Sequence, residues 1–219
     1  MTEVIPAIIP ENLEDLYAKA DRVRAYVNIV QVDIMDGKFA PVTSWPYNNH
    51  EQFENLVKEG NPLLGDLSFD LDMMIERPED VIGRWMELGA KALIIHIDST
   101  KILEDIIPRA KERGVAVGIA LRPYTNNDVL EHWIPDINFV QFMGNQKIGY
   151  HGVELDDRVL QKITKLRKKY PKLSISVDIG VTFETAPSLI KAGANKLISG
   201  STIFNAENIN EAIEKLKNV

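Results

Sequence analysis

The amino-acid sequence predicts one domain, a single (β/α)8 barrel over residues 1–219, and three observations support this fold. Short apolar runs typical of β-strands alternate with longer segments of helical spacing along the whole chain. Eight such runs occur, and several are apolar at almost every position, as in parallel strands that are covered on both faces. The length of 219 residues suits eight βα units, for which about 250 residues are typical.

Each predicted element is recognised from its own residue pattern. The strands are expected at residues 4–9, 29–35, 67–75, 92–97, 116–121, 139–143, 174–177 and 196–199. Between them, apolar residues three or four apart mark helices, and Leu13, Leu16 and Ala20 share one such face. Pro78 suits the first turn of a helix, and Gly193 suits a helix end. A doubly wound open sheet is the alternative fold, but the first strand lacks the Gly-x-Gly-x-x-Gly turn of many such sheets.

Composition and charge exclude several classes of function. The chain has no cysteine, which excludes disulfides, thiolate metal sites and cysteine nucleophiles. Its net charge of −7 disfavours nucleic acids and anionic membranes as partners. We interpret the basic run from Lys162 to Lys172 as the solvent-facing side of a helix. No apolar run approaches the roughly 20 residues of a membrane span, and no secretion signal is recognisable, so we expect a cytoplasmic protein.

Polar residues interrupt the predicted strands near their C-terminal ends, where barrel enzymes place their active sites. Gln31 and Asp33 are two residues apart, as are Asp70 and Asp72, so each pair faces one side of its strand. Asp33, Asp72 and Asp178 come from three different strands and are expected to converge on the barrel axis. Buried carboxylates are costly unless they are paired or bound to a cation. A divalent cation would therefore offset the mutual repulsion of these three aspartates.

Five segments, in chain order and each at a predicted strand end, carry a family resemblance. They are Val32-Asp33-Ile34-Met35-Asp36-Gly37-Lys38-Phe39, Asp70-Leu71-Asp72-Met73-Met74-Ile75, His96-Ile97-Asp98, Val177-Asp178-Ile179-Gly180-Val181 and Ser199-Gly200-Ser201-Thr202-Ile203-Phe204. The first is similar to the pattern V-D-x-M-D-G-x-F almost letter for letter. On these motifs the chain resembles the ribulose-phosphate 3-epimerase family of ribulose-phosphate-binding barrels over essentially its whole length.

The resemblance implies a reaction, a small sugar-phosphate substrate and the residues that act on it. The reaction is inversion of carbon 3 of a ketopentose 5-phosphate, with Asp33 and Asp178 as acid and base on opposite faces of the substrate. A divalent metal ion would stabilise the oxyanion formed beside that carbon. The implied site wall consists of Met35, Met74, Met143, His96 and Arg122. The implied phosphate-binding backbone consists of Gly180, Val181, Gly200, Ser201, Gly149 and Gly152.

The chain departs from the family at both metal-binding histidines, because Gln31 and Asp72 occupy those positions. In one interpretation, Gln31, Asp33, Asp72 and Asp178 hold the metal as an all-oxygen set, which favours manganese, magnesium or calcium over zinc or iron. In the other, the metal is lost, and the barrel acts on another sugar phosphate or only binds one. Related hexulose-phosphate synthases share the fold, but residues 70–75 lack the Lys and the second Asp of their D-x-K-x-x-D signature.

Two further expectations concern residues outside these motifs. Arg122 stands where the family has asparagine, and it either pairs with Asp72 or Asp98 or contacts the substrate. The family often forms homo-oligomers, and we expect one here. Trp45 and Tyr47, taken as exposed aromatic residues, are the candidates for its interface.

Overall fold

The computed structural model describes residues 2–219 and confirms the predicted (β/α)8 barrel. Its parallel strands are hydrogen-bonded in chain order and close into a barrel. They are β1 (Glu3–Ile8), β2 (Ile29–Met35), β3 (Ser68–Met74), β4 (Ala92–His96), β5 (Ala116–Leu121), β6 (Phe139–Met143), β7 (Ser174–Asp178) and β8 (Lys196–Ser199). Strands β2, β5, β6 and β8 have the predicted bounds, and the others differ by one residue at one or both ends.

Helical segments follow the strands, as the alternating pattern predicts. They are α1 (Leu13–Val23), α2 (His50–Glu59), η1 (Pro78–Asp80), α3 (Ile82–Glu87), α4 (Leu103–Glu112), η2 (Asn127–Leu130), α5 (Arg158–Lys169), α6 (Ala186–Ala192), α7 (Ser201–Phe204) and α8 (Ile209–Lys217), where η marks a 3-10 helix. Leu13, Leu16 and Ala20 are buried on α1, as predicted. Gly193 ends α6 in the left-handed conformation, which glycine adopts without a steric penalty. Within residues 2–219, none of the helices combines the length and apolar character needed to cross a membrane.

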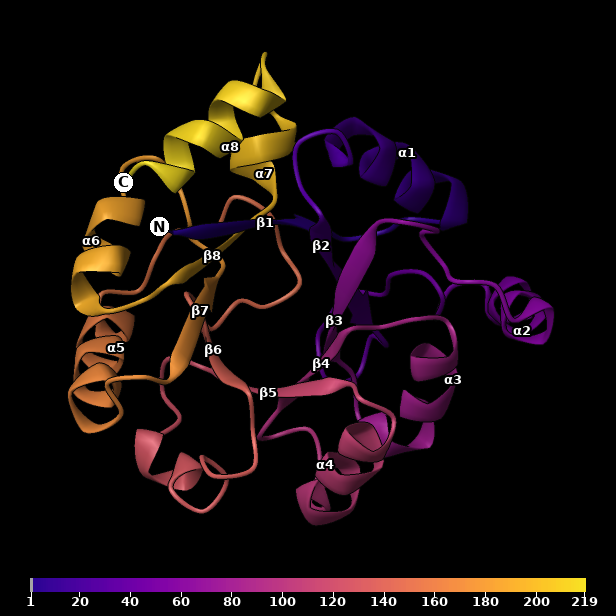
Figure 1. Ribbon diagram of the computed structural model, residues 1–219, viewed down its shortest axis with the longest axis horizontal. Coiled ribbons are helices and arrows are strands. Elements are labelled where there is room, and N and C mark those ends of the chain that lie inside the picture. Colours follow the sequence, from indigo (N-terminus) through magenta and orange to yellow (C-terminus); the bar gives the residue numbers. More distant parts are fainter. Residues whose placement is uncertain (1) are drawn as a thin grey trace. The chain divides into compact units, whose positions relative to one another are not determined.

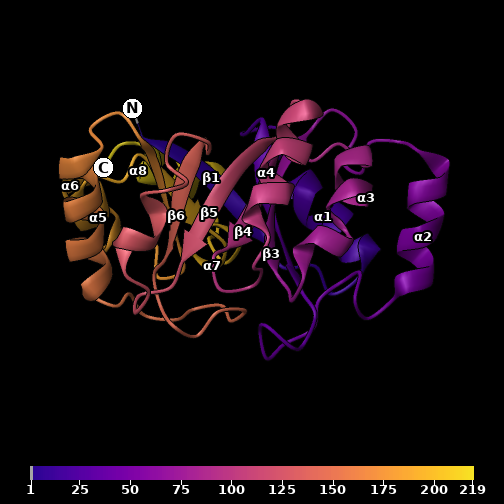
Figure 2. The ribbon, with the colours of Figure 1, turned by 90° about the horizontal axis from the view of Figure 1, so that it is seen from below.

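The chain divides into two compact units, residues 7–117 and residues 1–6 with 118–219. In the first unit, α1, α2 and α3 lie outside strands β2, β3 and β4 (Figure 1, Figure 2). In the second unit, α5 and α6 lie side by side outside β7 in both views. Each unit thus carries strands whose C-terminal ends bear candidate site residues.

The register of β2 on β3 aligns the polar residues of the first unit. Asp33 lies opposite Asp72, and Met35 lies opposite Met74. Because side chains alternate along a strand, these four residues share one face of the sheet. Ile34 points to the other face and is fully buried as well, so the strand is covered on both sides, as its apolar sequence predicts.

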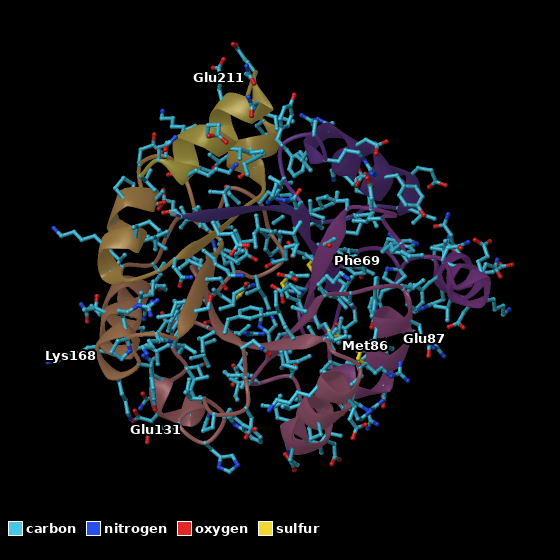
Figure 3. The ribbon with its side chains drawn as sticks, viewed as in Figure 1. Phe69, Met86, Glu87, Glu131, Lys168 and Glu211 are labelled. Carbon is cyan, nitrogen blue, oxygen red and sulfur yellow. The ribbon has the colours of Figure 1, made fainter. Side chains whose placement is uncertain are left out.

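An aromatic cluster packs behind this sheet, and it corrects one expectation. Trp45 is fully buried, with its ring 5.9 Å from that of Phe53 and 6.0 Å from that of Trp85. Phe69 points from β3 toward α3, where its ring lies 6.4 Å from Trp85 (Figure 3). The expectation that Trp45 is an exposed interface residue is therefore wrong, because its ring packs against Phe53 of α2 and Trp85 of α3. Tyr47 is half-buried.

The basic run on α5 is only partly a solvent-facing surface. Lys168 extends away from the helix into solvent, as expected (Figure 3). Lys162, however, donates from Nζ to the backbone carbonyls of Arg122 and Thr125 at 2.5 and 2.6 Å. Arg167 donates to four backbone carbonyls near the ends of α5 and α6. These two cations tether loops to the helix, so for them the solvent-facing interpretation is wrong.

The aromatic cluster should contribute strongly to stability. Replacing Trp85 with alanine is expected to lower the free energy of unfolding by about 3–5 kcal/mol, because a large cavity would remain in a packed layer. Urea denaturation measures this loss. Tyr26→Ala is the control, since Tyr26 is 43% exposed and should change stability by no more than about 0.5 kcal/mol. Equal losses for the two variants would show that the cluster is not a stabilising core.

Candidate active site

Asp33 lies near the C-terminal end of β2 and is fixed by residues on both sides of it. Gln31 Nε2 donates to Asp33 Oδ1 over 2.8 Å, and both side chains are buried. Further along the chain, Ser44 Oγ accepts from the Met35 amide at 3.0 Å and lies 3.2 Å from the Asp33 carbonyl oxygen. The segment after β2 therefore fixes the stretch of backbone that carries the Asp33 carboxylate.

Asp72 lies beside Asp33 on β3, and a histidine from β4 contacts it. His96 Nε2 is 2.9 Å from Asp72 Oδ1, and the two side chains are 1% and 0% exposed. The Phe39 ring packs edge-on against the imidazole, with ring centroids 5.1 Å apart. The sequence predicts His96 as a wall residue, and the structure shows that its imidazole is a partner of Asp72.

Asp178 ends β7 in the second unit. It lies opposite Met143 of β6 and is 7% exposed. Its Oδ1 accepts a hydrogen bond from the amide of the next residue, Ile179, at 2.7 Å. A backbone N–H donor of this kind stabilises a charged carboxylate.

The turn after β7 is held in a strained conformation. Ile179 has a φ of 73°, a left-handed conformation that costs an L-residue about 1–2 kcal/mol. Gly144 after β6 makes room for it, because a Cβ on Gly144 would lie 1.8 Å from the Ile179 carbonyl oxygen. The Gly144 amide also donates to the Asp178 carbonyl. The bare Cα of Gly144 therefore allows the two strand ends to approach and fixes the backbone of Asp178.

The two loops predicted to bind phosphate are joined through one carbonyl group. The Val181 carbonyl accepts from Ser199 Oγ at 3.1 Å and from Thr202 Oγ1 at 2.8 Å. Residues 180–181 and 200–201 consequently lie close together. Gly180 packs against the backbone of Leu155, where an added Cβ would come within 2.8 Å.

The remaining predicted residues lie at strand ends or in loops. The methionines of the predicted wall are buried at the ends of β2, β3 and β6, and they are Met35, Met74 and Met143. Arg122 follows β5 and is half-buried. Gly149 and Gly152 lie in the loop between β6 and α5, with φ of 84° and 67°.

Three of the predicted metal ligands form a buried acidic cluster that can hold a metal ion. Asp33, Asp72 and Asp178 each offer one carboxylate oxygen, and these oxygens lie within 4.8 Å of one another. Three anionic groups this close repel one another unless a proton or a cation lies among them. The convergence of the three aspartates is therefore as the sequence predicts.

Comparison with known proteins agrees with the motifs. Residues 3–204 match the Ribulose-phosphate 3 epimerase family. The chain belongs to this family. Ribulose-phosphate 3-epimerase from Bacillus subtilis is 31% identical over 99% of each chain. The enzyme of that name from Schizosaccharomyces pombe is 30% identical, over 99% of this chain and 92% of its own. These relatives are enzymes named as carbohydrate-phosphate epimerases.

Solved structures with the same fold have more distant sequences. 3-Hexulose-6-phosphate synthase from Salmonella typhimurium superposes with a TM-score of 0.71 at 17% identity, covering 100% of this chain and 97% of that one. A mutant tryptophan synthase alpha-subunit from Pyrococcus furiosus gives a TM-score of 0.69 at 13% identity, covering 100% of both chains. At these identities the likeness establishes the barrel fold alone.

Sequence reasoning missed Ser44 and the pairing of His96 with Asp72. Ser44 lies in a loop without periodic pattern, so no local signal indicates that it bonds the end of β2. For His96 a signal exists, since period two along β4 places it on the face of Ile94, which lies opposite Asp72.

Ser44 should be needed to hold the end of β2. Ser44→Ala leaves the buried Met35 amide without its acceptor, which is expected to lower the free energy of unfolding by about 1–3 kcal/mol. Thermal and urea unfolding measure this loss. Thr43→Ala is the matched control, because Thr43 is exposed and should change stability little. If the two variants are equally stable, Ser44 does not fix the strand end.

Proposed function

We propose that the protein is an isomerase that inverts carbon 3 of a ketopentose phosphate by proton transfer through Asp33 and Asp178. The observation that carries the proposal is the buried aspartate cluster in a member of the ribulose-phosphate 3-epimerase family. Inverting a carbon next to a carbonyl requires a base on one face and an acid on the other. Family membership supports the reaction, and the two carboxylates support the mechanism.

Each proposed acid/base residue accepts a hydrogen bond from a neutral donor. Asp33 takes its hydrogen bond from the Gln31 amide group, and Asp178 takes its own from the Ile179 backbone amide. A carboxylate has two oxygens with several acceptor sites, so such a bond does not prevent it from taking a proton. Removal of the carbon-3 proton by one aspartate gives a planar enediolate. Delivery of a proton by the other aspartate, from the opposite face, inverts the carbon.

The donor set fits a divalent cation. Gln31, Asp33, Asp72 and Asp178 would hold it through oxygen atoms, and such a set favours manganese or magnesium over zinc or iron. Because Gln31 directs its Nε2 to Asp33, its carbonyl oxygen is the atom suited to a cation. A bound cation supplies electrostatic stabilisation of the oxyanion next to carbon 3.

The substrate phosphate is assigned to the backbone of the β7–α6 and β8–α7 loops. The shared Val181 carbonyl, bonded to Ser199 and Thr202, supports this assignment because it holds the two loops together. Glycine at positions 180 and 200 allows an anion to approach the backbone amides. The loops after strands seven and eight are the usual phosphate site of barrel enzymes. Gly149 and Gly152 are proposed to cover the phosphate from the β6–α5 loop.

The proposal covers one domain that acts on a small molecule. The family match over residues 3–204 spans both compact units, which supports a single functional barrel. A net charge of −7 disfavours nucleic acid as a partner. A cytoplasmic location and a homo-oligomeric state stay predictions.

Exchange of the carbon-3 proton tests the reaction directly. With ribulose 5-phosphate in D2O and Mn2+ or Mg2+ present, the protein is expected to incorporate deuterium at carbon 3, as followed by NMR. Asp33→Asn and Asp178→Asn should each slow the exchange by about 10²–10⁴-fold, because each removes an acid/base group. Asp66→Asn is the control, since Asp66 is a surface carboxylate with a side chain 91% exposed.

The outcomes separate the proposal from its alternative. The alternative is a barrel that binds a sugar phosphate without epimerising it, and the replacement of both family histidines favours it. That barrel would be thermally stabilised by ribulose 5-phosphate but would show no exchange with Mn2+, Mg2+, Zn2+ or Fe2+. Such a result contradicts the proposed function.

Loss of the bond between the two phosphate loops should weaken substrate binding and spare the chemistry. Thr202→Val removes the donor to the Val181 carbonyl without changing the shape of the side chain, so KM for ribulose 5-phosphate is expected to rise about fivefold, the effect of one hydrogen bond. The value of kcat should stay near that of the wild type. Thr164→Val is the control, because Thr164 makes a similar bond to the Leu160 carbonyl on α5. A fall in kcat at constant KM would argue against the phosphate assignment.

A further inference from the structure

We infer that His96 is a positioning residue that orients the Asp72 carboxylate to receive a divalent cation. The inference rests on the proposed metal-assisted function and adds a residue to it. His96 comes from β4, the strand next to β3, and is not itself among the acidic cluster. Its only role expected from the sequence is that of a wall residue.

The contacts of the two imidazole nitrogens indicate which of them donates a hydrogen bond. Nε2 lies 2.9 Å from Asp72 Oδ1. Nδ1 is buried and, within residues 2–219, has no hydrogen-bond partner. A proton on Nδ1 would be a buried donor without an acceptor, which costs about 1–3 kcal/mol. The arrangement therefore favours a proton on Nε2, from which it is donated to Asp72.

This bond restricts the orientation of the Asp72 carboxylate. The terminal torsion of an aspartate is broad, so a carboxylate on a strand does not choose its own orientation. The bond from His96 holds Oδ1 and, because the carboxylate is planar, restricts the position of Oδ2 as well. Gln31 acts in the same way on Oδ1 of Asp33. The two adjacent carboxylates thus each accept a hydrogen bond from a side chain of the same unit.

The contact of His96 with a carboxylate depends on the residue at position 72 of this chain. Position 72 is where the family resemblance places a histidine ligand, and here it is an aspartate. The surrounding packing limits movement of the imidazole, since His96 is 1% exposed and the Phe39 ring lies against it. Partners of this kind around metal ligands typically alter metal affinity by about 10–100-fold when they are removed.

Manganese binding by metal-free protein tests the inference without reference to catalysis. The dissociation constant for Mn2+ is measured by electron paramagnetic resonance or calorimetry for the wild type, His96→Phe, His96→Gln and His132→Phe. We expect His96→Phe to weaken binding about 10–100-fold, because it fills the space but cannot donate. His96→Gln keeps a donor and should stay within about threefold of the wild type. His132 is exposed, so its variant serves as the matched control and should bind as the wild type does.

Each outcome decides the inference. A folded His96→Phe variant with wild-type Mn2+ affinity overturns it. If that variant does not fold, the comparison moves to His96→Asn and His96→Gln, since the shorter amide does not reach Asp72. Equal affinity of these two overturns the inference, and weaker binding by the Asn variant supports it. A wild type that exchanges deuterium at carbon 3 without binding Mn2+ overturns the inference and leaves the proposed function intact. If Mn2+ binding depends on His96 but the protein shows no deuterium exchange, the inference is supported and the proposed function is contradicted.

Discussion

The side-by-side burial of Asp33 and Asp72 is the constraint on which the rest of the site depends. The β2–β3 register places them opposite each other, and they are 4% and 0% exposed. Two carboxylates in such a position are stable only if donors or a cation offset their charge. Gln31 and His96 each supply one donor. Both donors come from the same sheet. The negative charge of the two carboxylates can be offset further by a bound cation.

The second unit places the Asp178 carboxylate and the proposed phosphate-binding residues 180 and 181 at the end of the same strand. Asp178 is held by its neighbouring amide, and the turn that supplies this amide is left-handed at Ile179. A β-branched residue keeps such a conformation only where the surroundings enforce it. Here Gly144 provides the space and a bond to the strand end. Backbone strain thus occurs next to a proposed catalytic residue, and strained residues are often found at functional sites.

Much of this could be predicted from local sequence patterns. Strand period and apolar runs give β2 with its observed bounds, and period two places Asp33 and Asp72 on a common face. What failed depends on contacts between distant segments. Trp45 in a polar loop gives no sign that it is buried, and Ser44 gives none that it bonds β2. Lys162 belongs to a run of charges that is typical of a solvent-facing helix surface, yet it donates to a loop carbonyl. This contact depends on the tertiary fold and not on the neighbouring residues in the sequence.

The central claim is that Asp33 and Asp72 together bind a divalent cation. Crystals of the protein grown with MnCl2 and measured at the manganese absorption edge test this claim most directly, through the anomalous difference map. The account predicts one strong peak bonded to carboxylate oxygens of both Asp33 and Asp72. The claim would be contradicted if crystals grown at saturating Mn2+ showed well-ordered Asp33 and Asp72 side chains but no anomalous peak beside them.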